Sequence, residues 1–279
     1  KVLLEVKKTP MINLQIQKLI EWGLDDFVII TNPQYDQLIK DVTSSIQGIS
    51  IDYVIQNEPK GISHAFLQAE NKVSEDEAIV CVLGDNFFGE DLLNNVNFEN
   101  FVQNQKSLIF TKEVNNPEEF GVASIGQDQK VIEIIEKPKN PASNLAVVGV
   151  YIFDYSMFNK IKTLKPSKRG ELEITDLINI YIDKSCCEHI QLNSWWVDAG
   201  TPETFLKANL DLLNGARDKK INGVHDQASV STNAVVESSI IGSGVKIADG
   251  AHVEISVLMD GAEVEKNARI EGSIVGERA

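Results

Sequence analysis

The chain has 279 residues, enough for one large domain and a smaller one. Its formal net charge of −15 argues against nucleic acid and anionic membranes as partners, so an anionic substrate needs a local positive site. Three cysteines, two of them adjacent, give neither a disulfide framework nor zinc spacing, which is typical of a reducing cytoplasm. No apolar run reaches transmembrane length, and no secretory signal is visible.

Helical and strand patterns alternate over the first 86 residues, which indicates an α/β domain. The apolar periodicity and its flanking Pro10 and Gly23 predict a helix over Met11–Trp22. The same reasoning predicts helices over Gln34–Val42 and Ile62–Lys72, and strands over Asp26–Thr31 and Ile51–Gln56. The apolar run Ala78–Leu83 predicts a strand buried on both faces, as in a parallel sheet.

Gly84 and Asp85 follow this strand directly, at the rim where ligands of open α/β sheets bind. A carboxylate placed there suits a hard cation with phosphate oxygens on its other side. A plain turn that ends the strand is the alternative, and the stretch by itself does not decide between the two.

From about Ser107 the strands follow one another through turns, which predicts an antiparallel or mixed extension of the sheet. The predicted strands are Ser107–Glu113, Gly121–Ile125, Val131–Glu136, Ala146–Phe153 and Trp196–Asp198. The predicted helices are Met157–Lys162, Glu173–Lys184 and Pro202–Leu213.

A 17-residue repeat follows a loosely patterned linker. Apolar residues recur at 230, 236, 241, 247, 253, 258, 264, 270 and 275, in steps of six, five and six. One inward residue per flat face, with three faces per coil, indicates a parallel β-helix, whereas a β-sandwich needs alternation at two. The predicted domains are therefore residues 1–214, a linker at 215–227 and a β-helix at 228–279.

Gln56 and Gly61 lie in a loop between a predicted strand and a predicted helix. The amide of Gln56 can pair with a polar edge of a base, and Gly61 allows close backbone approach. A plain strand-to-helix loop remains the alternative.

Glu136 and Lys137 end a predicted strand, where neighbouring side chains face opposite ways. The carboxylate suits sugar hydroxyls and the ammonium suits a phosphate, although a solvated strand end is also possible. Further on, we expect Glu173 to act as a helix cap and Glu171 to contact a ligand.

Asp198 is a second carboxylate at a predicted strand end, close to Gly200. Together with Asp85 it could share one Mg²⁺ that also binds a triphosphate. Asp198 as a cap of the helix that begins at Pro202 is the alternative. The four histidines, which show no metal spacing and no partnered nucleophile, are interpreted as structural or surface residues: His64, His189, His225 and His252.

Eight motifs occur in the order seen in sugar-phosphate nucleotidyltransferases, and the chain most resembles the long form of the glucose-1-phosphate thymidylyltransferases. These motifs are Lys1–Leu4, Gln56–Gly61, Leu83–Asn86, Glu119–Val122, Glu136–Pro138, Ser143–Tyr151, Arg169–Asp176 and Trp196–Thr201. The resemblance implies an α/β fold, in which a three-layer Rossmann-like domain with a mixed sheet precedes a short left-handed parallel β-helix. The implied reaction transfers a nucleotidyl group from a pyrimidine nucleoside triphosphate to glucose 1-phosphate and releases pyrophosphate, with dTTP favoured and UTP as the alternative.

The resemblance also implies roles for individual residues. Asp85, Asp198 and Lys137 would be catalytic, with Mg²⁺ held by Asp85 and Asp198 and the sugar phosphate held by Lys137. Gln56 and the backbone of Gly61 would read the base. The remaining substrate-binding residues are Lys1 at the N-terminal signature and Gly121, Glu136, Val148 and Glu171 around the sugar.

Two departures from the family pattern qualify this prediction. The Gly-rich loop expected before Lys1 is absent, and Glu5 stands where the family often has proline. We therefore expect slow turnover by the chain as written, with a catalytically impaired binding protein of regulatory or assembly role as the alternative. Acyl transfer at the β-helix is a third alternative, weakened by its few coils and by the lack of a partner for His252. A homo-oligomer is expected through residues 228–279, since the last coil ends with unpaired backbone groups.

Overall fold

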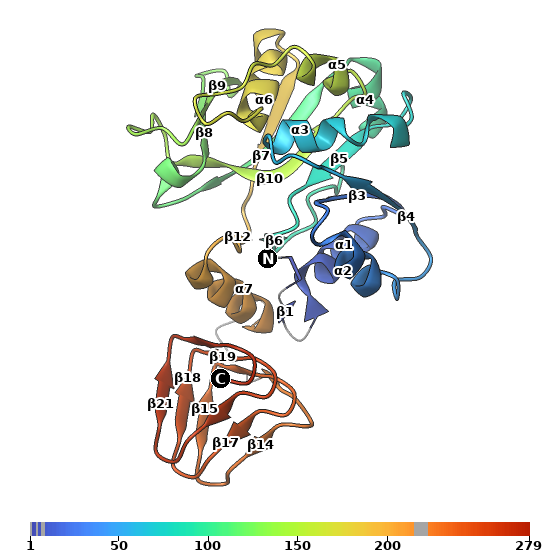
Figure 1. Cartoon of the computed structure of the whole chain (residues 1–279). Coiled ribbons are helices and arrows are strands. Elements are labelled where there is room, and N and C mark those ends of the chain that lie inside the picture. Colours follow the sequence, from blue (N-terminus) through green and yellow to red (C-terminus); the bar gives the residue numbers. More distant parts are fainter. Residues whose placement is uncertain (1, 4, 7–8, 215–222) are drawn as a thin grey trace. The chain divides into compact units, whose positions relative to one another are not determined.

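The computed structural model describes residues 2–3, 5–6, 9–214 and 223–279 (Figure 1). The chain divides into two compact units, each described here by itself. One unit comprises Ile16–Asn86 and Asp91–Ser194, and the other comprises Lys1–Gln15, Phe87–Glu90 and Trp195–Ala279. We call them the sheet unit and the β-helix unit. The predicted domain boundaries at 214 and 228 remain a proposal.

The sheet unit is built on a six-stranded sheet in the order β11-β7-β10-β8-β9, with β5 paired to β10. Strands β10 and β7, β10 and β8, β8 and β9, and β10 and β5 pair antiparallel, whereas β11 and β7 pair parallel. The predicted mixed sheet is therefore confirmed. The strands are β5 (Ile79–Val82), β7 (Ser107–Glu113), β8 (Gly121–Ile125), β9 (Val131–Glu136), β10 (Leu145–Phe153) and β11 (Cys187–Gln191).

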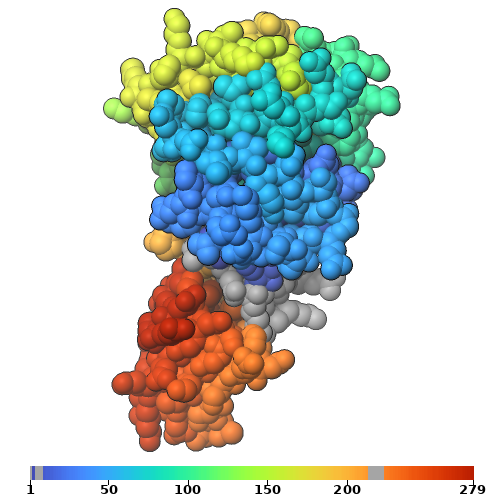
Figure 2. All heavy atoms as spheres, turned by 45° about the vertical axis from the view of Figure 1, so that its right-hand side comes forward, coloured from blue at the N-terminus to red at the C-terminus, as the bar shows by residue number. Residues whose placement is uncertain are grey.

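A parallel pair of strands precedes this sheet. Strands β3 (Asp26–Thr31) and β4 (Ser50–Ile55) pair in register over six residues, and α2 (Asp36–Thr43) connects them. Helix α2 lies at the surface in the space-filling view (Figure 2, blue). The helix α1 (Met11–Glu21) ends one residue before its predicted end, because the chain turns at Gly23, whose φ is +88°.

Three helices cover one face of the sheet: α3 (Ile62–Leu67), α5 (Met157–Ile161) and α6 (Ile174–Asp183) (Figure 1). Their apolar side chains, including Phe66, Phe158 and Tyr181, pack on β7, β9 and β10. Each large side chain buried in this way contributes roughly 1.5–3 kcal/mol. Leu108, Phe110, Val150 and Ile152 point to the opposite face and are at most 2% exposed, so the sheet is buried on both faces. The remaining elements here are η1 (Glu70–Lys72), α4 (Phe98–Gln103) and η2 (Pro117–Glu119).

The strand after residue 78 differs from its prediction. Strand β5 pairs antiparallel with β10, from Val82 opposite Val150 to Ile79 opposite Phe153, and not with a parallel neighbour. The prediction was wrong because an apolar run reports burial and carries no information about the direction of the neighbouring strand.

The β-helix unit contains a small mixed region and a stack of coils. Strands β1 (Glu5–Val6) and β2 (Thr9–Pro10) form an antiparallel pair, and β6 (Asn86–Phe88) pairs with β12 (Trp196–Asp198). The helix α7 (Pro202–Asn214) follows, and its Phe205 and Ala208 are buried with Met11 and Phe87 in a local core.

Residues 223–279 form the predicted parallel β-helix (Figure 2, orange to red). Its strands stack as three parallel ladders in the described chain, each with an offset of 17 residues, for example Val236 opposite Val253 and Val253 opposite Ile270. The first coil begins at Gly223, inside the predicted linker, of which residues 215–222 lie outside the described chain. The first ladder consists of β13 (Gly223–Val224), β16 (Ile240–Ile241), β19 (Val257–Leu258) and β22 (Ile274–Val275). The second consists of β14 (Ser229–Val230), β17 (Lys246–Ile247) and β20 (Glu263–Val264). The third consists of β15 (Val235–Glu237), β18 (His252–Glu254) and β21 (Arg269–Glu271).

A column of serines connects successive coils. The backbone N–H of Ser256 donates to Oγ of Ser239, and the N–H of Ser273 donates to Oγ of Ser256, both at 3.1 Å. Each hydroxyl in turn donates to the carbonyl two residues before it at 2.7 Å. The serines therefore satisfy backbone groups at the coil corner that would otherwise be buried without a partner.

No helix among the described residues is both long and apolar enough to cross a membrane.

Candidate functional site

The predicted base-reading residues are held together at the end of the β3–β4 pair. The N–H of Gln56 donates to the carbonyl of Thr31 at 2.7 Å, which extends the ladder by one residue beyond β4. Side-chain Nε2 of Gln56 then donates to the carbonyl of Gly61 at 3.2 Å and contacts Nδ1 of His64 at 2.9 Å. The structure thus brings Gln56 and Gly61 into one loop, together with a histidine that the sequence interpretation treated as structural.

Gly61 fits where no other residue would. Its φ of +99° is in the region that favours glycine. A Cβ added there would lie 2.6 Å from the carbonyl oxygen and 2.8 Å from the nitrogen of Leu172, and 3.0 Å from Cβ of Glu171. The N–H of Leu172 also donates to the carbonyl of Lys60 at 2.8 Å. The Gln56–Gly61 loop therefore packs directly against the segment that carries Glu171.

Arg169 joins the predicted sugar-binding carboxylates. Its guanidinium lies 3.1 Å from a carboxylate oxygen of Glu171, 3.4 Å from Glu136 and 3.8 Å from Glu173. One cation facing three carboxylates leaves the cluster with a net negative charge, which suits hydroxyl donors on a ligand. Sequence reasoning missed Arg169, although it stands in the same motif, two residues before Glu171.

Burial raises the pKa of Glu136 above its ordinary value, and the negative charge of Glu173 adds to this, while Lys137 and Arg169 act in the opposite direction. Asp176, in the first turn of α6, has its pKa raised in the same way, first by burial and then by Glu173. The cluster therefore concentrates carboxylates that accept hydrogen bonds readily.

Gly121 and Lys137 complete this wall of the site. Gly121 pairs with Glu136 in register across β8 and β9, and a Cβ there would lie 2.9 Å from Cγ2 of Thr175 and 3.5 Å from Oε2 of Glu136. Lys137 follows Glu136 with φ at +42°, a conformation that its N–H supports by donating to the carbonyl of Phe120 at 3.0 Å.

Glu173 does not cap α6 as predicted. It occupies the N-cap position, but its side chain makes no capping hydrogen bond. Instead its carboxylate accepts a hydrogen bond from Oγ of Ser167 at 2.7 Å and faces Arg169. The prediction failed because the arginine and serine compete for this carboxylate, and neither contact is visible in local sequence.

Asp85 lies in the turn after β5, and its orientation is set by a neighbour. Nδ2 of Asn86 donates to Oδ1 of Asp85 at 3.0 Å, while the N–H of Gly149 donates to Oδ1 of Asn86 at 3.1 Å. Asn86 is fully buried, and a Cβ added to Gly149 would lie 2.7 Å from its side chain. Sequence reasoning quoted Asn86 within a motif but gave it no role. Val148 is fully buried, at the irregular segment of β10 between Val147 and Tyr151, and its role at a sugar stays a prediction.

Asp198 belongs to the other unit, where it is the last residue of β12. Thr201, directly before α7, supplies one capping contact: the N–H of Thr204 donates to Oγ1 of Thr201 at 3.2 Å. The pairing of Asp198 with Asp85 at a metal stays a prediction, and Lys1 lies outside the described residues.

The carboxylate of Asp85 fits the donor preference of Mg²⁺. This ion is usually held by one or two carboxylates together with substrate phosphates and water, not by an all-protein cage. Among the described residues, no cluster of three or more His, Cys, Asp and Glu side chains could hold a metal ion.

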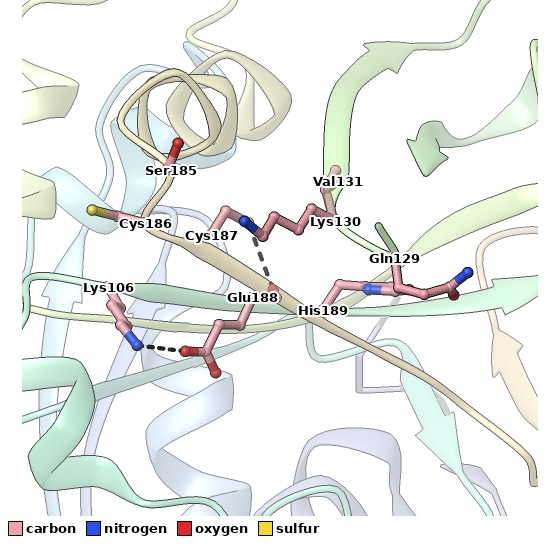
Figure 3. A pocket seen from close by; sticks show the side chains of 9 residues that line it. All are labelled: Lys106, Gln129, Lys130, Val131, Ser185, Cys186, Cys187, Glu188 and His189. Atoms are coloured by element: carbon pink, nitrogen blue, oxygen red, sulfur yellow. Dashed lines mark hydrogen bonds and ion pairs between the residues drawn. The ribbon is translucent and has the colours of Figure 1, made fainter. Parts of the chain in front are cut away.

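A cavity of about 410 Å³ lies elsewhere in the sheet unit, beside β9 and β11 (Figure 3). It is lined by Lys106, Gln129, Lys130, Val131, Ser185, Cys186, Cys187, Glu188 and His189, none of which is a predicted site residue. Lys106 is paired with Glu188 at 2.7 Å. Burial raises the pKa of Cys187 to about 11 and lowers that of His189, so neither supplies a thiolate or an imidazolium at neutral pH. We therefore assign no chemistry to this cavity.

Comparison with known proteins agrees with this geometry. The model of the family described as nucleotidyl transferase matches residues 1–215, and that of the GMPPB C-terminal domain matches residues 220–279. The chain belongs to the nucleotidyl transferase family. The predicted family resemblance is thus confirmed.

Named relatives within this family differ in activity. A low-salt glycan biosynthesis nucleotidyltransferase, Agl11 of Haloferax volcanii, is 34% identical over 82% of this chain and 65% of its own length. The bifunctional protein GlmU of Methanococcus aeolicus is 37% identical over 68% of this chain and 43% of its own length. The glucose-1-phosphate thymidylyltransferase of Neisseria meningitidis serogroup A is 36% identical over 75% of this chain and 73% of its own length. The chain thus spans less than two thirds of the length of the first two.

Solved structures give the same fold. A Bacillus anthracis structure assigned to glucose-1-phosphate thymidylyltransferase, in complex with sucrose, superposes with a TM-score of 0.68 and 37% identity, covering 79% of this chain and 88% of that one. A UDP-glucose pyrophosphorylase bound to UDP-glucose superposes with a TM-score of 0.62 and 23% identity, covering 75% of this chain and 88% of that one. This likeness supports the fold alone.

Proposed function

We propose that the protein transfers a nucleotidyl group from a pyrimidine nucleoside triphosphate to glucose 1-phosphate, giving a nucleotide-sugar and pyrophosphate. The observation that carries this proposal is the continuous chain of contacts from Gln56 through Gly61 and Glu171 to Arg169 and Glu136. It places groups suited to a base next to groups suited to a sugar, in one unit of a nucleotidyl transferase family member.

The base-reading part rests on complementary hydrogen-bonding groups. The N–H of Gly61 makes no hydrogen bond with the described residues and can donate to a base carbonyl. Nearby Gln56 offers its amide oxygen to an N–H of the same base. We favour dTTP over UTP because relatives such as that of Neisseria meningitidis are named thymidylyltransferases.

The sugar part rests on Glu136, Glu171, Gly121 and the backbone of Val148, whose acceptors suit the hydroxyls of a hexose. Lys137, at the end of the same wall, would hold the phosphate of the sugar. Holding the two substrates in line is the main contribution of the protein, because an oxygen of the sugar phosphate can attack the α-phosphorus without a covalent protein intermediate.

Asp85 would be a ligand of Mg²⁺, and Asp198, a residue of the β-helix unit, is proposed as a metal ligand separately. When bound, the ion would neutralise charge on the triphosphate oxygens as pyrophosphate leaves. Asn86 keeps the Asp85 carboxylate in one orientation by its hydrogen bond, which reduces the reorganisation needed for ligand binding.

The test is Mg²⁺-dependent release of pyrophosphate from dTTP or UTP by the full chain, measured with and without glucose 1-phosphate. We expect release that needs the sugar phosphate and that Glu171→Gln reduces. Release that does not depend on the sugar phosphate, or no binding of either nucleotide, would overturn the proposal. Assembly into a homo-oligomer through residues 228–279 is a separate proposal, which light scattering on the full chain tests.

A further inference from the structure

His64 contacts the residue that would read the base, although its sequence context gave it only a structural role. It lies on α3, with Nδ1 2.9 Å from Nε2 of Gln56. On the other side of the ring, Nε2 lies 3.4 Å from Nε2 of Gln68, which also donates to the His64 carbonyl at 3.0 Å. The imidazole is thus held between two amide side chains.

The hydrogen-bond pattern fixes both the amide orientation and the imidazole tautomer. A carbonyl oxygen can only accept, so the Gln56 atom that lies 3.2 Å from the Gly61 carbonyl must be the NH₂ group. That same nitrogen faces Nδ1 of His64, which must therefore also accept. A neutral imidazole that accepts at Nδ1 carries its proton on Nε2. The NH₂ group of Gln68 also faces Nε2, but at 3.4 Å this contact is longer than an ordinary hydrogen bond, so the 2.9 Å contact at Nδ1 decides the tautomer.

Both hydrogens of the Gln56 amide are consequently used inside the protein. Its oxygen, Oε1, makes no hydrogen bond with the described residues and is not among their buried polar atoms without a partner, so it faces solvent. Gln56 can therefore offer a ligand an acceptor but no donor. The sequence-based expectation that the amide pairs with a polar edge of a base is thereby narrowed to its acceptor.

We propose that His64 is a positioning residue that locks the Gln56 amide with Oε1 outward, so that the nucleotide site selects a base with an imide N–H, as in thymine and uracil. The inference rests on the proposed base-reading role of Gln56. Without the acceptor at Nδ1, only the Gly61 carbonyl holds the amide, and the side chain turns more easily to orientations that present its NH₂ group to the imide N–H.

Two side-chain substitutions separate positioning from packing. In His64→Leu the acceptor is removed, whereas in His64→Asn an amide oxygen can take the place of Nδ1. We expect calorimetry to show roughly tenfold weaker Mg²⁺–dTTP binding for His64→Leu, near wild-type binding for His64→Asn, and no change for the matched control His189→Leu. In a Gln56→Leu background, His64→Leu should have no further effect, because the residue acts through Gln56.

Nitrogen NMR of the ligand-free protein tests the tautomer directly, with His64→Leu assigning the signal. Protonation at Nε2 is expected, and protonation at Nδ1 would overturn the inference whatever the protein catalyses. Equal losses from His64→Leu in the wild-type and Gln56→Leu backgrounds would also overturn it, since they indicate packing alone. If Gln56→Leu itself leaves dTTP binding unchanged, the base-reading part of the proposed function fails, and the role of His64 fails with it.

Discussion

Lys137 combines a strained backbone with a proposed chemical role, and two substitutions at this position separate them. Its φ of +42° costs a non-glycine residue about 1–2 kcal/mol, and the following Pro138 disfavours helical conformations further. Lys137→Ala keeps the strain and removes the ammonium, whereas Lys137→Gly removes both. After about 0.5 kcal/mol is subtracted for the larger entropy of glycine in the unfolded chain, the glycine variant should be more stable than the alanine variant by about 1 kcal/mol.

For a chain of this size that difference corresponds to a Tm about 2 °C higher for Lys137→Gly than for Lys137→Ala. Both variants should bind glucose 1-phosphate about 10- to 100-fold more weakly than the wild type, since each loses a charged hydrogen-bond donor. Thermal unfolding and calorimetry measure the two effects separately. Equal Tm values would refute the strain argument, and wild-type affinity in either variant would refute the phosphate role.

Three further predictions concern the carboxylates and their surroundings. Asp85→Asn and Asp198→Asn should each weaken Mg²⁺-dependent dTTP binding with little change in Tm. Gly149→Ala should destabilise the protein by about 1–3 kcal/mol and weaken the same binding, because its Cβ would displace Asn86 from Asp85. Glu136 has a raised pKa in the folded chain, so its stabilising contribution is complete below about pH 4.5 and is lost as pH rises through the folded value. Glu136→Gln should therefore gain stability relative to the wild type as pH increases, measured by urea unfolding.

Each of these predictions has a matched control or a contrary outcome. If Asp85→Asn or Asp198→Asn lowers the Tm but leaves the nucleotide affinity unchanged, the substituted residue has a structural role. Gly276→Ala, where an added Cβ meets nothing within 4 Å, should change neither stability nor binding. A loss of stability of Glu136→Gln relative to the wild type with rising pH would contradict the raised pKa.

Much of the fold was predictable because local signals agree with one another. Strands β3, β7, β8, β9 and β12 have the predicted bounds, since apolar residues of strand period end at clear turn residues. By contrast β11 was missed, because four of its five residues are polar or cysteine and it is mostly exposed. The partner of β5 was predicted wrongly, since strand direction depends on residues 145–153, far along the chain.

Candidate site residues could be chosen from the sequence where a residue type is itself unusual for its position. Gly61, Gly121 and Asp85 stand at element ends where a missing side chain or a carboxylate has few structural explanations. Arg169 and His64 were missed because their contacts with Glu136 and Gln56 are made by folding. Asn86 was missed because the hydrogen bond that holds its side chain comes from Gly149, far along the chain.

The constant offset of 17 residues in the β-helix limits how its gene can change length. Because each serine receives the N–H of the serine 17 residues later, duplication of one 17-codon block would add a coil with every polar group partnered as before. An insertion of another length would turn the inward apolar column outward from that point on. We therefore expect relatives to differ in the length of this segment by whole coils, without a matching change in the length of the sheet unit.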